Sequence, residues 1–198
     1  MERPAASARE YARRQFEQGA RSAGNGSLMR LVPVVLFYFP DARKIQSFAA
    51  DSSRTTHAAP EAIECCQLLA GLIARALEGA SKAELRQLPF ASFSQSKVAA
   101  IAHGEYLVLS ETDIRGNGYS VQSLEAALWC FWHTGSYKEA VLRAANLGDD
   151  ADTTAAIVGQ LAGAWYGVDA IPPAWREKVT MGEAIVALAD RLLAERQL

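Results

Sequence analysis

Residues 60–79, with the sequence PEAIECCQLLAGLIARALEG, constrain the fold most because their apolar side chains follow the period of an α-helix. Spacings of three and four residues place one apolar face on this segment, as in a helix that packs against a core. The face consists of Ile63, Cys66, Leu69, Ile73 and Leu77. Pro60 suits the first turn of such a helix, and Gly79 can end it in a left-handed cap.

Three further helix starts are predicted by capping boxes, in which a hydroxyl side chain and a Glu three residues later satisfy unpaired backbone N–H groups. The pairs are Ser81 with Glu84, Ser136 with Glu139, and Thr180 with Glu183. Two other segments carry helical stripes. Residues 121–133 place Leu124, Leu128 and Phe131 on one face, and residues 181–197 are expected to turn Ile185, Leu188 and Leu192 inward.

Two segments depart from the simple helical pattern. The run LVPVVLFYF at residues 31–39 is rich in β-branched and aromatic residues, which favours a buried strand, although periodicity alone does not separate this from a buried helix. Gly159 and Gly163 lie four residues apart in a helical segment, where glycine is intrinsically unfavourable. Close packing against another helix backbone is the reason we expect for that pair.

Composition places the 198 residues in the range of one globular domain, with 50% hydrophobic and 21% charged residues and a net charge of -2. No basic block favours nucleic-acid binding, and no apolar run is long enough to span a membrane. The N-terminal residues lack the apolar core of a secretory signal. Three cysteines, two of them adjacent, are a poor disulfide framework and indicate a reducing, cytoplasmic compartment.

The stretch LGDDADTTAAIVGQLAGAWYG, residues 147–167, concentrates three carboxylates and two threonines at one helix start. Asp150, Asp152 and Thr153 could turn toward one point and offer hard oxygen ligands to Mg²⁺, Mn²⁺ or Ca²⁺. The alternative is an N-cap with an acidic first turn, which the helix dipole favours. One cap needs only one Asp, however, and a cation would relieve the repulsion among three.

A glycine-rich segment, RSAGNGSLMR at residues 21–30, is the second candidate. Gly24 and Gly26 permit backbone conformations that expose successive N–H groups to an anion, and an Asn-Gly turn between two strands is the alternative. GNG occurs again at residues 116–118, but the flanking sequence does not repeat. His57 lies in a polar loop just before the helix at residue 60, where a histidine is usually only solvated. The hydrolase, nucleotide-loop and zinc motifs GxSxG, Walker A, HExxH and GxGxxG are all missing from these residues.

Together these stretches resemble the ADP-ribosylglycohydrolase family. The matching pieces are SAGNGSLMRLVPVV, the TH of RTTHAAPEAIECC, GYSVQSLEAALWCFWHTGSYKEAVLRAANL and LGDDADTTAAIVGQLAGAWYG, in the family's order. The resemblance implies a compact all-α fold, so that residues 31–39 would form a buried helix. It also implies a single ADP-ribosylglycohydrolase-like domain over residues 1–198 that lacks the family's N-terminal segment.

The function implied by the resemblance is hydrolysis of the bond between ADP-ribose and a protein side chain or small acceptor, with two Mg²⁺ or Mn²⁺ ions. The family pattern makes Asp150, Asp152 and Thr153 metal ligands. It makes Ser22, Gly24, Asn25, Gly26 and His57 the residues that bind ADP-ribose. The GDxxGxxxE and Thr-Asp-Asp motifs, which carry the family's catalytic Glu and remaining ligands, do not occur here, so no catalytic residue is assigned. A non-catalytic ADP-ribose-binding module and a helical remnant with a structural or interaction role are the alternatives.

Overall fold

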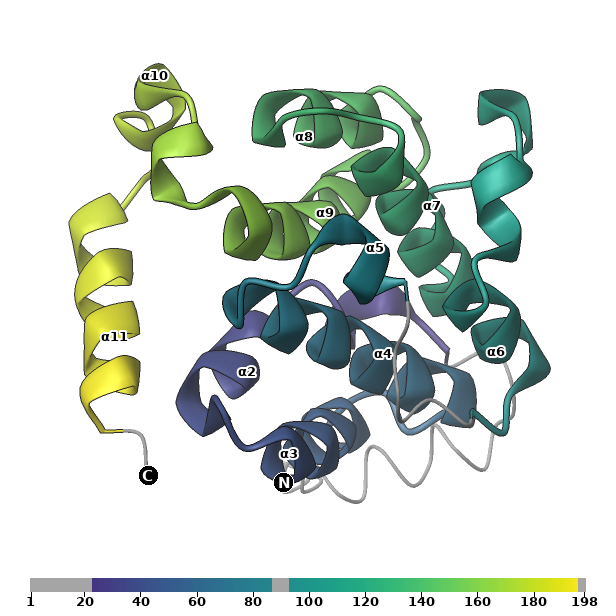
Figure 1. The fold of residues 1–198 in the computed structure, drawn as a ribbon, viewed down its shortest axis with the longest axis horizontal. Coiled ribbons are helices and arrows are strands. Elements are labelled where there is room, and N and C mark those ends of the chain that lie inside the picture. The colour runs from purple at the N-terminus through teal and green to yellow at the C-terminus, as the bar shows by residue number, and fades with distance from the viewer. Residues whose placement is uncertain (1–22, 87–92, 196–198) are drawn as a thin grey trace, which may run out of the picture.

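The computed structural model describes residues 23–86 and 93–195, and within them every regular element is a helix (Figure 1). The expected all-α fold is therefore confirmed. The longer helices are α2 (Val32–Tyr38), α3 (Ala42–Arg54), α4 (Pro60–Leu77), α6 (Ser96–Ala102), α7 (Ser120–Trp132), α8 (Tyr137–Ala145), α9 (Ala151–Tyr166) and α11 (Gly182–Ala194). Short turns are η2 (Asn25–Ser27), α5 (Lys82–Leu85), η3 (Glu105–Val108), η4 (Glu111–Asp113), η5 (Val168–Ala170) and α10 (Pro173–Arg176). None of the described helices combines the length and hydropathy needed to cross a membrane.

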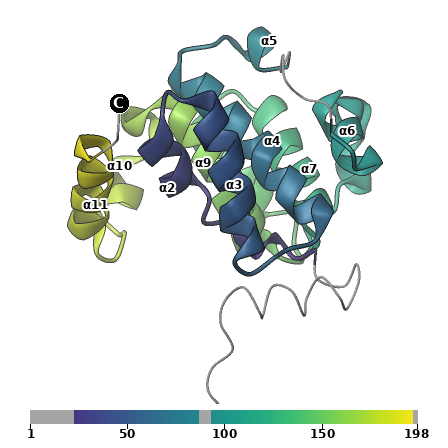
Figure 2. The same cartoon turned by 90° about the horizontal axis from the view of Figure 1, so that it is seen from below.

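Helix α4 is the centre of the core. It packs against α3 on one side and against α7 and α9 on others, and Figure 2 shows α2, α3, α4 and α7 following one another across the molecule. The predicted helix at residues 60–79 is confirmed, with Gly79 in the left-handed region at φ 83° just after its end. Its burial is wider than one face, because Cys65, Leu68 and Leu72 are buried as well, while Leu77 is exposed. The helix is therefore enclosed by neighbours rather than lying on a surface.

Residues 32–38 form helix α2, with Leu31 and Phe39 as its caps, so the strand favoured by the composition of residues 31–39 is wrong, and the helix implied by the resemblance is right. Pro33 lies in the first turn, where its missing N–H costs no helical hydrogen bond. Only Leu31 and Val35 of this run are fully buried, four residues apart on one face. The β-branched and aromatic residues fill that face and its flanks, which shows that packing overrides strand propensity here.

The three predicted capping boxes have different outcomes. Ser81 and Glu84 form the complete reciprocal box at the start of α5. At α8, Ser136 accepts from the Glu139 N–H as predicted, but the Glu139 carboxylate accepts from Gly135 instead of Ser136. The box at Thr180 and Glu183 is wrong, because α11 begins at Gly182 after Met181 in a left-handed conformation.

The last helix differs most from its prediction. Among the described residues α11 packs mainly against α2, and Figure 1 shows it at the edge of the molecule. Ile185 and Leu188 are exposed, so the inward face predicted for residues 181–197 is wrong at both. Gly159 and Gly163 both face Tyr137 of α8, but a Cβ at Gly159 would lie 3.6 Å from its hydroxyl and one at Gly163 would lie 3.9 Å from its ring. These are ordinary contacts with a side chain, so the close approach of a helix backbone predicted for this pair is wrong.

Phe131 anchors the other end of the core, as the stripe on residues 121–133 predicted. Its ring is fully buried and makes edge-on contacts with Trp132, Trp165 and Tyr166, with centroids 5.1 to 6.2 Å apart. The Lys82 ammonium lies 4.6 Å from the ring centroid. Helices α5, α7 and α9 therefore meet at one aromatic side chain.

We expect Phe131→Ala to lower the free energy of unfolding by about 3–5 kcal/mol, because it leaves a cavity and removes the aromatic and cation contacts together. Urea unfolding followed by circular dichroism measures the loss. Val108→Ala is the matched control, since Val108 is 90% exposed and should change stability little. Equal effects of the two substitutions would contradict this account of the core.

Candidate functional site

The acidic segment at residues 149–154 crosses from a loop into helix α9. Gly148 and Asp149 both take positive φ, at 80° and 52°, and this turns the chain sharply before Asp150 at the N-cap position. The Asp150 side chain makes no capping hydrogen bond to the helix. The capping alternative is therefore wrong for this carboxylate, which points to another partner.

That partner is Asn25, in the glycine-rich segment. The Asn25 Nδ2 donates to Asp150 Oδ2 across 2.6 Å, although the two residues are 125 positions apart in the chain. Asn25 is 7% exposed, and its amide also donates to the Ser123 hydroxyl at 2.8 Å. The structure thus brings the two motifs singled out from the sequence into direct contact.

The structure decides one of the two alternatives set out for the glycine-rich segment and leaves anion binding by its N–H groups a prediction. Gly24 pairs with Tyr119 in an isolated antiparallel bridge, and residues 25–27 form the short turn η2, so the turn between two strands is wrong. Neither Gly24 nor Gly26 takes a positive φ. The reason for glycine at both positions is space: an added Cβ would lie 3.2 Å from the His57 ring at Gly24 and 2.9 Å from it at Gly26.

His57 packs its imidazole against this loop and is more than a solvated surface residue. Its backbone is fixed by the Ser53 hydroxyl, which donates to the His57 carbonyl, and by the His57 N–H, which donates to the Ser53 carbonyl at 2.7 Å. The Thr56 hydroxyl lies 2.8 Å from Nδ1. Burial, and secondarily the charge of Arg30, lower the pKa of His57 below its ordinary value, which favours a neutral ring.

The remaining predicted residues lie at different depths. Thr153 is buried in the first turn of α9, and its hydroxyl lies 3.9 Å from the Met29 sulfur, whereas Asp152 is exposed. Ser22 lies outside the described residues. In the part of the chain that the structure describes, no three His, Cys, Asp or Glu side chains form a group that could hold a metal ion. Asp150, Asp152 and Thr153 therefore stay a predicted ligand set.

Sequence reasoning missed residues 116–120, which join the two motifs. The Gly118 carbonyl accepts from the Asn25 N–H at 3.1 Å, and the Gly116 carbonyl accepts from the Asp150 N–H at 2.9 Å. A third bond, from the Ser120 N–H to the Ala23 carbonyl, is 2.8 Å long. The available signal was the second GNG at residues 116–118, because the two GNG segments lie side by side.

Next to this segment, three side chains from different elements form a polar cluster that the sequence did not reveal. The Tyr119 hydroxyl donates to the Glu61 carboxylate and accepts from Lys97 at 2.9 Å. Lys97 also lies 3.5 Å from Glu61. The cluster ties α4 and α6 to the residue that pairs with Gly24.

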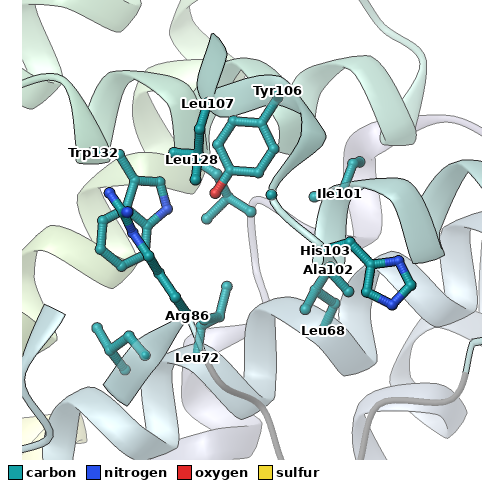
Figure 3. Close-up of a pocket in the computed structure, with 12 residues that line it drawn as sticks. Leu68, Leu72, Arg86, Ile101, Ala102, His103, Tyr106, Leu107, Leu128 and Trp132 are labelled. Carbon is teal, nitrogen blue, oxygen red and sulfur yellow. The ribbon is translucent and has the colours of Figure 1, made fainter. Parts of the chain in front are cut away.

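A separate cavity lies between α4, α5, α6, η3 and α7 (Figure 3). Leucine and other apolar side chains line most of it, with Arg86 and Trp132 on one side and His103 on the other. Its volume of about 60 Å³ corresponds to roughly two water molecules at about 30 Å³ each, and it includes none of the predicted site residues. ADP-ribose is far larger, so this cavity does not compete with the loop and the acidic segment as the candidate site.

The structure is all-α, and its glycine-rich loop is hydrogen-bonded to the acidic start of a helix. Comparison with known proteins assigns a chain with these features to one family. The ADP-ribosylglycohydrolase family model matches residues 2–198. The chain therefore belongs to the ADP-ribosylglycohydrolase family.

Particular relatives agree with this assignment. ADP-ribosylarginine hydrolase Tri1 of Pseudomonas putida is 44% identical over 171 residues, which cover 86% of this chain and 46% of the relative. The ADP-ribosyl-[dinitrogen reductase] glycohydrolase of Rhodospirillum rubrum is 28% identical, over 80% of this chain and 51% of the relative. A solved ADP-ribosylglycohydrolase-related protein complex superposes with a TM-score of 0.82 at 38% identity, covering 97% of this chain and 70% of the solved one. The chain spans about half the length of the curated relatives it matches.

Gly26→Val is expected to weaken ADP-ribose binding, because any Cβ at residue 26 would lie 2.9 Å from the His57 ring and force the ring or the loop to move. Isothermal titration calorimetry measures the affinity, after circular dichroism has established that the variant is folded. Gly135→Val is the control, since its Cβ would meet only the Glu139 carboxylate at 3.6 Å. Unchanged affinity in a folded Gly26→Val protein would contradict this role of the loop.

His57 should also make stability depend on pH. Because its pKa is lowered on folding, the unfolded chain binds more protons, so stability is lost as the pH falls through 6.5. We expect His57→Gln to flatten the fall in melting temperature between pH 7.5 and pH 5.5, measured by thermal denaturation. Identical slopes for the parent and His57→Gln would refute the prediction.

Proposed function

We propose that the described residues form the ADP-ribose-binding half and part of the metal-binding half of an ADP-ribosyl hydrolase site. One observation carries the proposal: the 2.6 Å hydrogen bond from Asn25 to Asp150 joins the glycine loop to the acidic segment across 125 residues. Neither motif needs the other for helix formation. Their contact is what a site that holds a diphosphate beside a cation requires.

The loop of Gly24, Asn25 and Gly26, preceded by Ser22 in the family pattern, would hold the diphosphate. A side chain at Gly24 or Gly26 would meet the His57 ring, so the glycines let this ring lie against the loop that would hold the diphosphate. The neutral ring of His57 would lie near the bound ribose, where it can donate or accept one hydrogen bond. The chain's own contribution is to fix the ADP-ribose in one orientation.

Mg²⁺ or Mn²⁺ fits the donors of the acidic segment in kind. Asp150, Asp152 and Thr153 carry oxygen ligands, and the Asp150 carboxylate is not engaged in capping. They would fill only part of two coordination shells. When bound, the ions would orient the ribose hydroxyls and stabilise charge that develops during cleavage.

The substrate class we favour is ADP-ribosylated arginine. The support is the 44% identity to a relative named for that activity. The bond hydrolysed would then be the N-glycosidic bond between the ribose and the guanidinium.

Residues 1–198 tested alone should hydrolyse ADP-ribosyl-arginine at or near the background rate, even with millimolar Mg²⁺. Three ligands for two ions leave the ions loosely placed, and small misplacements of a reacting group cost large factors in rate. Adding a family N-terminal segment with its Glu and Thr-Asp-Asp, in trans or as a fusion, should raise the rate. Release of ADP-ribose, followed by chromatography, measures it.

The gain should disappear in Asp150→Asn and in Asp152→Asn, tested in the same complemented protein. Asp169→Asn is the matched control, because Asp169 lies in η5 and is 98% exposed. Robust Mg²⁺-dependent turnover by residues 1–198 alone, lost in Asp152→Asn, would instead mean that another carboxylate of this chain acts in catalysis. If the chain neither binds ADP-ribose nor gains activity when the N-terminal segment is added, a structural or interaction role is the remaining function.

A further inference from the structure

The Asn25 side chain is occupied within the protein. Its Nδ2 carries two hydrogens and faces three acceptors: Asp150 Oδ2 at 2.6 Å, the Ser123 hydroxyl at 2.8 Å and the Asn117 carbonyl at 3.3 Å. All three accept, so the amide nitrogen rather than the amide oxygen must face them. No hydrogen remains on Nδ2 for a phosphate oxygen, so this amide group serves its neighbours in the protein rather than a ligand.

The backbone of Asn25 is fixed to the loop just as firmly. Its N–H donates to the Gly118 carbonyl at 3.1 Å, and its carbonyl accepts from the Leu28 N–H at 2.9 Å. The His57 ring limits movement at Gly24 and Gly26, which lie on either side of Asn25 in the chain. A shift of the loop must therefore move the amide that Asp150 accepts from, and a shift of Asp150 must strain the loop.

The bond to Asp150 involves a carboxylate, which makes it stronger than a hydrogen bond between neutral groups. Asp150 has no capping bond to hold its side chain, so Asn25 is the side-chain partner that the described structure gives it. Partners of this kind orient metal-binding carboxylates, and their loss typically lowers metal affinity by about 10–100-fold.

We propose that Asn25 is a positioning residue that couples the two parts of the site, so that an anion on the glycine loop and a divalent cation at Asp150 and Asp152 each raise the affinity for the other. The proposal rests on the proposed function and adds a regulation of that site. Because the coupling is a free energy shared by both sites, it must be equal in either direction.

The experiment uses ADP-ribose and Mn²⁺ as probes on the chain of residues 1–198. Calorimetry measures ADP-ribose binding with and without Mn²⁺, and electron paramagnetic resonance of free Mn²⁺ measures cation binding with and without ADP-ribose. In the parent protein we expect each ligand to tighten the other by the same factor. Asn25→Ala should weaken Mn²⁺ binding about 10–100-fold and reduce the mutual factor.

Asn25→Asp distinguishes positioning from simple loss of structure. An added carboxylate beside Asp150 should tighten Mn²⁺ binding and weaken ADP-ribose binding, whereas a damaged fold would weaken both. Asn146→Asp is the matched control: it adds the same charge at the C-cap position that follows α8, where the exposed Asn146 amide donates to the Leu142 carbonyl. We expect it to leave both affinities near those of the parent.

Three results would overturn the inference. Equal Mn²⁺ affinity in the parent and a folded Asn25→Ala protein would show that Asn25 does not position Asp150. Parallel weakening of both ligands in Asn25→Asp would show a structural role only. A mutual effect of the same size in the parent and in a folded Asn25→Ala protein would show that the coupling does not run through Asn25 while leaving the proposed function intact, whereas binding of neither ligand by the parent would overturn both.

Discussion

The candidate site depends on hydrogen bonds made by the backbone of residues 116–120. The Gly116 and Gly118 carbonyls accept from Asp150 and Asn25, and the Ser120 N–H donates to Ala23. This segment enters helix α7, which packs against both α4 and α9. A loop and a helix start far apart in the chain are therefore held at one place by a third segment that itself belongs to the core.

Closeness, rather than backbone freedom, explains three of the glycines around the site, Gly24, Gly26 and Gly116. Gly24 and Gly26 approach the His57 ring, and a Cβ at Gly116 would lie 2.9 Å from the Thr154 hydroxyl. None of these three takes a positive φ, in contrast to Gly79 and Gly148. The two groups look alike in a sequence, and only the packing separates a glycine that turns the chain from one that leaves room for a neighbour.

The sequence predicted most of the helices, because apolar periodicity and caps are local properties. It located α4, α7 and the capping box at Ser81, all of which depend on residues within a few turns of one another. It failed where distant packing decides: residues 32–38 are helical because one face is buried, and Ile185 on α11 is exposed because that helix packs mainly against α2 among the described residues. In the candidate site, both motifs were found, but the bond between Asn25 and Asp150 and the role of residues 116–118 depend on the tertiary fold.

Because Gly116, Gly118 and Ser120 hold the site through carbonyl and N–H groups, their importance is hidden from a survey that truncates one side chain at a time. Truncating the Ser120 side chain leaves its donating N–H in place, so such a variant would make this position appear tolerant of change. The exceptions are substitutions that alter the main chain or its spacing, such as a proline at Ser120 or any side chain at Gly116. A map of mutational sensitivity would therefore single out Gly116 and Ser120, although backbone groups along the whole segment join the glycine-rich loop to the start of helix α9.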